Sequence, residues 1–294
     1  MNKYEKTLAQ YVVELDDATV QMEVEKIVRD NYEKYNNVEV YKQLFNCIDL
    51  TTLRSEDYTD SVARFTQRVN DFENEHGDMP NVAAICVYPN YAATVRMNLE
   101  VSDVNIAAVS GGFPSSQTFT EVKVAETMLA VKDGADEIDI VINVGEMLER
   151  DYDRMANTIE VLRDELGEDV VLKVIIESGA LKTPELIYKA SMLAMFAGAD
   201  FVKTSTGKID VAATPEAAVV MCTAIRDYYT KTGRKVGFKA AGGVRTAEEA
   251  AYFYTIVEEI LGAEWLTPEL FRIGASSLAN NLIGAIEGKT VKYF

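Results

Sequence analysis

Eight apolar runs constrain the fold of this chain more than any other feature. Each run is followed by a longer amphipathic segment, and most runs are rich in Val, Ile and Ala without strict alternation. That composition is typical of parallel strands buried on both faces. The runs are LFNCID (44–49), AAICVY (83–88), VNIAAVSG (104–111), DEIDIVIN (136–143), VVLKVIIE (170–177), ADFVKTST (199–206), KVGFKAAG (235–242) and FRIGASS (271–277). Eight strand–helix repeats in about 250 residues predict an α/β fold, the TIM (β/α)8 barrel.

Helix-start signals between the runs support this prediction. Thr246 can cap a helix, with Glu249 placed to complete a capping box. Thr183 and Thr214 each stand as a cap before a proline at the first helical position. The alternative fold is a doubly wound open sheet. It more often has fewer strands and a nucleotide fingerprint, and neither GxGxxG nor GxxxxGK[ST] is present.

Residues 1–42 precede the first run. Asp16 or Asp17 can cap a helix there, because Val20, Val24 and Ile27 then fall on one face together with Val28. We expect an N-terminal helical extension that packs against the N-terminal end of the barrel or against a neighbouring subunit. Residues 43–294 are expected to form the catalytic barrel.

Composition excludes several classes of partner. The formal net charge of −18 argues against nucleic acid and anionic membranes, because both require basic surfaces. No apolar run is long enough to span a bilayer, and the polar N-terminus does not resemble a signal peptide. Cys47, Cys86 and Cys222 are far apart, which indicates reduced thiols in a cytoplasmic protein, the first two buried. The single histidine, His76, is expected in a surface loop, which argues against histidine-based zinc sites and Ser-His-Asp triads.

Two lysines lie inside apolar runs. Lys203 is in FVKTSTGK and Lys239 is in VGFKAAGGVRT. An ammonium in an apolar strand loses solvation, so its pKa falls, and a second cation nearby lowers it further. A lysine that is neutral near pH 7 can attack a carbonyl. The sequence therefore predicts Schiff-base chemistry; either lysine could be the nucleophile, and a salt-bridged structural role is the alternative for Lys203.

Three further polar residues interrupt or end these runs. Asp139 is in the middle of EIDIVIN, where a carboxylate is costly unless it is paired. It can be the structural partner of a lysine or can move protons at the carbon next to the imine. Asp49, followed by Thr51, ends the first run and can bind substrate hydroxyls or cap the turn. Lys173 is expected to pair with Asp139 or Asp49.

Three glycine- and serine-bearing turns follow the last three runs. They are STGK (205–208), AGGVRT (241–246) and GASS (274–277). Each offers free backbone N–H groups, two of them at predicted helix starts, and the loops after strands seven and eight often hold phosphate in this fold. Lys208 and Arg245 add positive charge. The turns predict a small phosphorylated carbonyl compound as substrate.

Four segments together carry a resemblance to a known family. FVKTSTGK, LKVIIESG, EIDIVIN and GFKAAGGVRTAEEA resemble deoxyribose-phosphate aldolase, a class I aldolase, and the similarity runs from about Asp49 to Gly288. The resemblance implies a TIM barrel that reversibly cleaves 2-deoxy-D-ribose 5-phosphate into D-glyceraldehyde 3-phosphate and acetaldehyde. It also implies no metal and no organic cofactor, a sugar phosphate and aldehydes as the partners, and a homo-oligomer, dimer or higher.

The resemblance also implies residue roles. Lys203 matches the Schiff-base lysine, Lys239 the lysine that perturbs its pKa, and Asp139 the proton-relay aspartate. The polar network around the sugar corresponds to Asp49, Thr51 and Lys173. The stretches associated with phosphate binding contain Gly207, Lys208, Gly242, Gly243, Arg245, Gly274, Ser276 and Ser277.

This chain departs from the family pattern in two places. Ala240 replaces the proline that usually follows the second lysine, which loosens the turn but removes no functional group. The third-strand loop, SGGFPSSQ, is also variant. Some members place a C-terminal tyrosine in the active site, and Tyr293 is the candidate here.

Two competing functions remain open at this point. One is another Schiff-base aldolase that acts on a different phosphorylated sugar or a keto acid, which a substrate panel would distinguish by asking whether acetaldehyde is the preferred donor. The other is a non-catalytic phosphate-binding barrel or an isomerase-like scaffold, which would bind sugar phosphates without covalent chemistry. Lys203, Lys239 and Asp139 argue against it, because a binding protein need not keep buried lysines beside a carboxylate.

Overall fold

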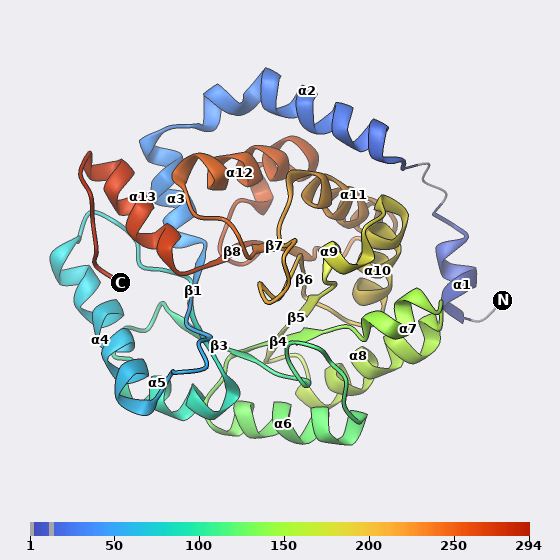
Figure 1. The fold of residues 1–294 in the computed structure, drawn as a ribbon, viewed down its shortest axis with the longest axis horizontal. Helices are drawn as coiled ribbons and strands as arrows, with labels where there is room; N and C mark the ends of the chain where they lie inside the picture. The colour runs from blue at the N-terminus through green and yellow to red at the C-terminus, as the bar shows by residue number, and fades with distance from the viewer. Residues whose placement is uncertain (1–2, 12–14) are drawn as a thin grey trace.

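The computed structural model describes residues 3–11 and 15–294, in which eight parallel strands close into a barrel (Figure 1). Each strand pairs with the next along the chain, and β8 pairs with β1. This closure confirms the predicted TIM barrel and excludes the open sheet. The strands are β1 Ile48–Thr51, β2 Ala84–Val87, β3 Asn105–Val109, β4 Glu137–Val141, β5 Val171–Ile175, β6 Phe201–Lys203, β7 Gly237–Ala241 and β8 Phe271–Ala275.

A ring of helices covers the outside of the barrel (Figure 1). They are α4 Thr59–Glu75, α5 Ala92–Asn98, α6 Thr120–Lys132, α7 Val144–Leu148, α8 Tyr152–Leu166, α9 Ser178–Leu181, α10 Pro184–Phe196, α11 Pro215–Thr232, α12 Ala247–Leu261 and α13 Ser277–Glu287, with short 3-10 turns at Pro89–Tyr91 and Ala263–Trp265. The predicted caps are confirmed. Thr246 and Glu249 form a capping box on α12, and the side chains of Thr183 and Thr214 cap α10 and α11.

The N-terminal segment lies along the side of the barrel. Its helices are α1 Lys3–Leu8, α2 Asp17–Tyr35 and α3 Val38–Asn46. Asp16 caps α2 as predicted, and α2 runs across α11 and α12 (Figure 1). Val20 and Ile27 of α2 are buried, and Tyr32 stacks on Tyr252. For α2, the expectation of packing at the N-terminal end of the barrel was therefore wrong, and contact with a neighbouring subunit stays a prediction. A long helix with a narrow apolar stripe covers neighbouring helices rather than closing the end of a barrel.

The start of the first strand differs from the prediction. The run LFNCID contains the last turn of α3, which ends at Asn46, so β1 begins at Ile48. The expected boundary between residues 42 and 43 thus lies inside α3. Leu44 and Phe45 are apolar because they pack α3 against the core, which a sequence pattern cannot distinguish from a buried strand.

His76 does not lie in an exposed loop. It ends α4, and its side chain is 15% exposed. The imidazole stacks on Phe72 and lies 3.2 Å from a carboxylate oxygen of Glu287. The sequence prediction considered only the polar residues next to His76. The aromatic partner, Phe72, lies one helical turn earlier in α4.

The three cysteines are all buried and form no disulfide, as predicted for Cys47 and Cys86. No helix in the described ranges has the length and hydropathy needed to cross a membrane.

Candidate active site

The interior of the barrel holds seven charged residues where a barrel core is usually apolar, and each residue is at most 4% exposed. They are Asp49 from β1, Glu137 and Asp139 from β4, Lys173 from β5, Lys203 from β6, Lys239 from β7 and Arg272 from β8. The strand register brings them together, because Asp139 pairs with Lys173 and Lys203 pairs with Lys239 on adjacent strands.

Asp139 is at the centre of this network. Its Oδ2 accepts hydrogen bonds from Nζ of Lys203 and from Nζ of Lys239, each at 2.7 Å. Its Oδ1 accepts from Nζ of Lys173 at 3.0 Å. Lys239 also donates to Asp49, so this lysine is held by two carboxylates and Lys203 by one.

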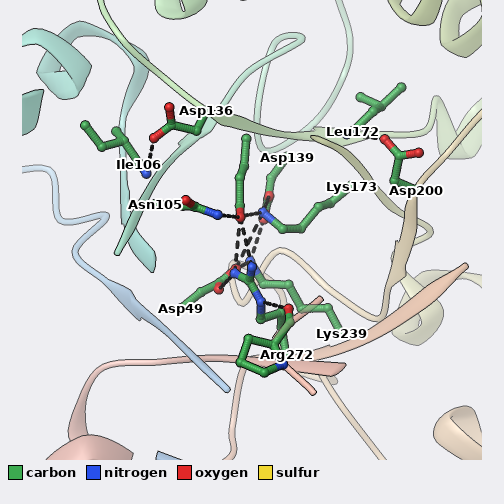
Figure 2. A network of polar contacts seen from close by, with 12 residues as sticks. Asp49, Asn105, Ile106, Asp136, Asp139, Leu172, Lys173, Asp200, Lys239 and Arg272 are labelled. Carbon is green, nitrogen blue, oxygen red and sulfur yellow. Dashed lines mark hydrogen bonds and ion pairs between the residues drawn. The ribbon is translucent and has the colours of Figure 1, made fainter. Parts of the chain in front are cut away.

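Arg272 links two carboxylates of the network, and Figure 2 shows it next to Asp49 and Lys239. Its guanidinium donates to Oδ1 of Asp49 at 2.5 Å and to Oε1 of Glu137 at 2.9 Å. Glu137 also accepts from Lys173 and from Nδ2 of Asn105. Every carboxylate of this network thus has at least two donors, which is the condition under which buried charges are tolerated.

The network contains four basic side chains and three carboxylates. One positive charge is therefore unbalanced when all seven are ionised, and the loss of one lysine proton balances it. Burial lowers the pKa of Lys203, and Lys239 lowers it further against the opposing effect of Asp139. Burial would also lower the pKa of Lys239, but Asp139 and Asp49 outweigh it and raise that pKa. Lys203 is thus the lysine that most readily becomes a neutral amine.

The carboxylates are held in their ionised forms. Burial alone would raise the pKa of Asp139, but Lys173, Lys203 and Lys239 hold it well below its ordinary value. Lys239 and Arg272 likewise outweigh burial and lower the pKa of Asp49. At neutral pH, Asp139 is therefore a proton acceptor rather than a stored acid.

A cleft of about 650 Å³ opens above Lys203 at the C-terminal ends of the strands. Ten of the predicted site residues line it: Thr51, Lys203, Gly207, Lys208, Gly242, Gly243, Arg245, Gly274, Ser276 and Ser277. The other four, Asp49, Asp139, Lys173 and Lys239, lie in the network and do not line the cleft. Of the three barrel lysines, only Lys203 reaches the space in which a substrate can lie.

Two of the predicted phosphate turns touch each other. Gly207 and Gly242 both have positive φ angles, 72° and 82°, and a Cβ on Gly242 would lie 3.0 Å from Cα of Gly207 and 2.7 Å from Cβ of Ala212. Only glycine fits this approach. The backbone N–H groups of Gly207, Gly242 and Gly243 have no acceptor among the described residues. Free N–H groups beside two basic side chains suit an anion such as phosphate.

Three arginines of the site, Arg54, Arg68 and Arg272, were not predicted from the sequence. Arg272 lies in the apolar run FRIGASS, so the pattern that singled out the lysines could have found it. Arg54 and Arg68, which also line the cleft, had no such signal because they lie in a loop and on an exposed helix face. Tyr293 does not line the cleft; its hydroxyl donates to the backbone oxygen of Arg68, and Phe294 lines the cleft instead. Within the described ranges, no group of three or more His, Cys, Asp or Glu side chains is arranged to hold a metal ion.

Comparison with known proteins places the site in a family. A family model described as DeoC/LacD family aldolase matches residues 45–282, which include all eight strands and all seven charged interior residues. The chain belongs to the DeoC/LacD aldolase family. The human deoxyribose-phosphate aldolase is 43% identical over 245 residues, which are 80% of this chain and 77% of the human protein. The bovine deoxyribose-phosphate aldolase is 43% identical over 242 residues, 79% of this chain and 76% of the bovine one.

A solved structure shares the fold of this family member. The tetrameric deoxyribose phosphate aldolase of Aeropyrum pernix superposes with a TM-score of 0.65, covering 88% of this chain and 96% of that one at 22% sequence identity. At that identity the match concerns the barrel fold alone. It agrees with the eight-stranded closure described above.

Proposed function

We propose that this chain catalyses the deoxyribose-phosphate aldolase reaction, in the breakdown of deoxyribose phosphates. In this reaction, 2-deoxy-D-ribose 5-phosphate is reversibly cleaved to D-glyceraldehyde 3-phosphate and acetaldehyde through a lysine Schiff base. One observation carries the proposal: Lys203 alone among the three barrel lysines lines the cleft, and its pKa is lowered. Identity to the human and bovine aldolases supports the substrate.

In the proposed mechanism, neutral Lys203 attacks C1 of the open-chain sugar phosphate, and loss of water gives an iminium. Removal of the C3 hydroxyl proton then breaks the C2–C3 bond, and glyceraldehyde 3-phosphate leaves. The electron pair of that bond passes to the iminium, which becomes an enamine. Protonation of the enamine carbon and hydrolysis release acetaldehyde and restore the amine.

Asp139 and Lys239 are assigned supporting roles. Asp139 is ionised and lies 2.7 Å from Nζ of Lys203, so it is the proposed proton acceptor and relay, directly or through water. Lys239 is the cation that depresses the pKa of Lys203. Asp49 and Lys173, fully buried below the cleft, are proposed to hold these charges in position rather than to touch the sugar.

The phosphate of the substrate is proposed to bind at the three glycine and serine turns. The open N–H groups of Gly207, Gly242 and Gly243 support this placement, as do Lys208 and Arg245 at the cleft. Ser276 and Ser277, at the start of α13, add further donors, and Gly274 allows close approach. Thr51 faces the cleft from β1, near the sugar in this proposal.

Borohydride trapping tests the proposal. The protein is incubated with 2-deoxyribose 5-phosphate, reduced, and analysed by intact mass and peptide mapping. We expect a reduced adduct on the peptide that contains Lys203, and no adduct and no turnover in a folded Lys203→Ala variant. An adduct on Lys239 would reverse the two lysine roles. Sugar-phosphate binding without any adduct would favour the non-catalytic barrel.

A substrate panel separates the remaining alternative, another Schiff-base aldolase. We expect acetaldehyde to be the preferred donor in the synthetic direction. Preference for a keto acid or a longer donor would reassign the substrate while keeping the lysine chemistry.

The assembly and location of the chain are further parts of the proposal. A homo-oligomer, dimer or higher, is supported by the tetramer of the Aeropyrum pernix protein. A cytoplasmic location is supported by three buried cysteines without a disulfide. We also propose that the N-terminal segment is an extension to the catalytic barrel, and that it ends with α3 rather than at the expected residue 42.

A further inference from the structure

A buried glutamate outside the ion network contacts the turn that carries Gly207 and Lys208. Glu177 follows β5, is 4% exposed and has the left-handed backbone angles φ 54° and ψ 58°. Both of its carboxylate oxygens accept from one residue. Oε1 accepts from the backbone N–H of Thr206 at 3.1 Å, and Oε2 accepts from the Thr206 hydroxyl at 2.6 Å.

The hydroxyl of Thr206 links Glu177 to the rest of the turn by a second hydrogen bond. The hydroxyl donates its hydrogen bond to Glu177, so the lone pairs of Oγ1 remain available as acceptors. Oγ1 accepts a hydrogen bond from the backbone N–H of Lys208 at 3.1 Å. That bond spans the positive-φ residue Gly207 and closes the turn. The three residues 206–208 all line the cleft.

Two features of Glu177 are unfavourable in isolation. A buried carboxylate with no basic partner, as here among the described residues, loses solvation without gaining an ion pair. A left-handed backbone is strained for a residue with a Cβ. Such features persist where surrounding contacts hold them, and they are concentrated at functional sites.

The backbone ladder fixes the position of Glu177 relative to the reactive lysine. The N–H of Ile176 donates to the backbone oxygen of Lys203 at 3.0 Å, and the N–H of Ser178 donates to that of Thr204 at 2.9 Å. Glu177 therefore lies between two rungs that join the end of β5 to β6. Its carboxylate holds Thr206, three residues beyond Lys203, by hydrogen bonds to the backbone N–H and the hydroxyl of that residue.

We infer that Glu177 is a positioning residue that acts through Thr206 to hold the turn 206–208 in the form that receives the phosphate of the substrate. This inference rests on the proposed function. It assigns to Glu177 no contact with the substrate and no proton transfer. Its effect belongs to recognition of the phosphate, not to the chemistry at Lys203.

Glu177→Gln tests the inference, because the amide keeps the size of the side chain but cannot accept from the hydroxyl at its NH2 end. We expect KM for 2-deoxyribose 5-phosphate to rise roughly tenfold, as for a lost charge-assisted hydrogen bond. We expect kcat, and kcat/KM for unphosphorylated 2-deoxyribose, to change by less than about twofold on the same reasoning. Inorganic phosphate should become a weaker competitive inhibitor by the same factor as the KM change.

Two controls make the result specific. Glu185→Gln makes the same chemical change on α10, where the side chain is 61% exposed and bonds to Lys189, and should alter nothing. Thr206→Val removes the hydroxyl that donates to Glu177 and should reproduce Glu177→Gln. It tests the same contact if Glu177→Gln does not fold.

The outcomes separate the inference from the proposed function. Equal losses on the phosphorylated and unphosphorylated substrates would show a merely structural role and overturn the inference. Unchanged kinetics in Glu177→Gln and Thr206→Val would overturn it as well. A wild-type protein that does not cleave 2-deoxyribose 5-phosphate would overturn the proposed function itself, and the inference with it.

Discussion

Lys203 and Lys239 share one oxygen atom: the Nζ atom of each lies 2.7 Å from Oδ2 of Asp139. They are register partners on β6 and β7, so they lie side by side on adjacent strands. What separates them is the second carboxylate, Asp49, which contacts Lys239. The asymmetry raises the pKa of Lys239 and leaves that of Lys203 lowered.

This relationship predicts the pH dependence of Lys239→Met. The reactive form of Lys203 is neutral, so activity is present above its pKa and is lost as the pH falls below it. Removing Lys239 removes a charge that lowers this pKa and leaves Asp139 to favour the ammonium form. The acidic limb of kcat/KM should therefore move to higher pH. At a fixed pH below the limb, activity should fall about tenfold for each pH unit by which the limb moves.

A full pH profile of kcat/KM measures this effect. Lys235→Met is the matched control, because Lys235 is paired with Glu264 at the surface, outside the network. An acidic limb that stays in place, or moves to lower pH, would contradict the role assigned to Lys239.

Asp139→Asn should separate imine formation from proton transfer. Asp139 raises the pKa of Lys203, so its loss favours the neutral amine, and borohydride should still trap an adduct. Turnover should fall by roughly 10²–10⁴-fold, the usual contribution of a general acid–base group. Deuterium incorporation from heavy water into the methyl group of acetaldehyde should slow by a similar factor.

Asp136→Asn is the control for that variant. Asp136 precedes β4 and pairs with Arg96 at the surface, so its loss should leave turnover within about twofold. Deuterium incorporation at the wild-type rate in Asp139→Asn would assign the proton relay to another group.

Burial decides which parts of this molecule are visible in its sequence. The eight strands and three turns were predictable, because a parallel strand is buried along its whole length and Gly, Ser and Thr mark where it ends. The lysines were visible because a charge interrupts an apolar strand. Which lysine has the lower pKa was not predictable from the sequence. The difference depends on Asp49, which is distant from Lys239 in the chain and contacts it only when β8 closes on β1.

Contacts of the outer helices were equally hidden. The stripe on α2 predicted a buried face but not which surface covers it, and only the fold selects α11 and α12. Phe294 reaches the cleft because Asn280 accepts from its backbone N–H and holds the tail. In the sequence, Glu177 is only the last residue of an apolar run. Its role was not predictable, because its partner Thr206 belongs to the next repeat.

Gly242→Ala should weaken recognition of the phosphate. The substitution strains a backbone with φ 82° and places a Cβ 2.7 Å from that of Ala212, so the turn must move away from Gly207. We expect KM for 2-deoxyribose 5-phosphate to rise about tenfold with little change in kcat, because uniform binding is lost. Steady-state kinetics on the phosphorylated and unphosphorylated sugars measures the difference.

Gly233→Ala is its matched control. Gly233 ends α11 with φ 73°, and a Cβ there meets nothing within 4 Å. Both variants should lose about 1–2 kcal/mol of stability from the left-handed backbone, but only Gly242→Ala should change KM. A KM change of equal size in both would indicate a global effect of strain.

Arg272→Met should destabilise the fold, because Arg272 forms ion pairs with two buried carboxylates of the network, Asp49 and Glu137. The variant leaves Asp49 and Glu137 with fewer cations in the interior, and breaking a buried pair costs about 3–5 kcal/mol. Urea denaturation at pH 7 measures this loss in the free energy of unfolding. Lys235→Met, which removes a surface ion pair and the contact of the Lys235 ammonium with the Trp265 ring, should lose less than about 2 kcal/mol.

The pH dependence of that loss identifies its cause. Burial would raise the pKa values of Asp49 and Glu137, but their basic partners lower them, so these carboxylates stabilise the fold above their unfolded pKa values, about 4. That stability disappears as the pH falls through the folded values. Because protonated carboxyls no longer need Arg272, the difference between variant and wild type should be present at pH 7 and shrink as the pH falls below about 4. A deficit independent of pH would attribute the loss to packing of the arginine side chain rather than to its charge.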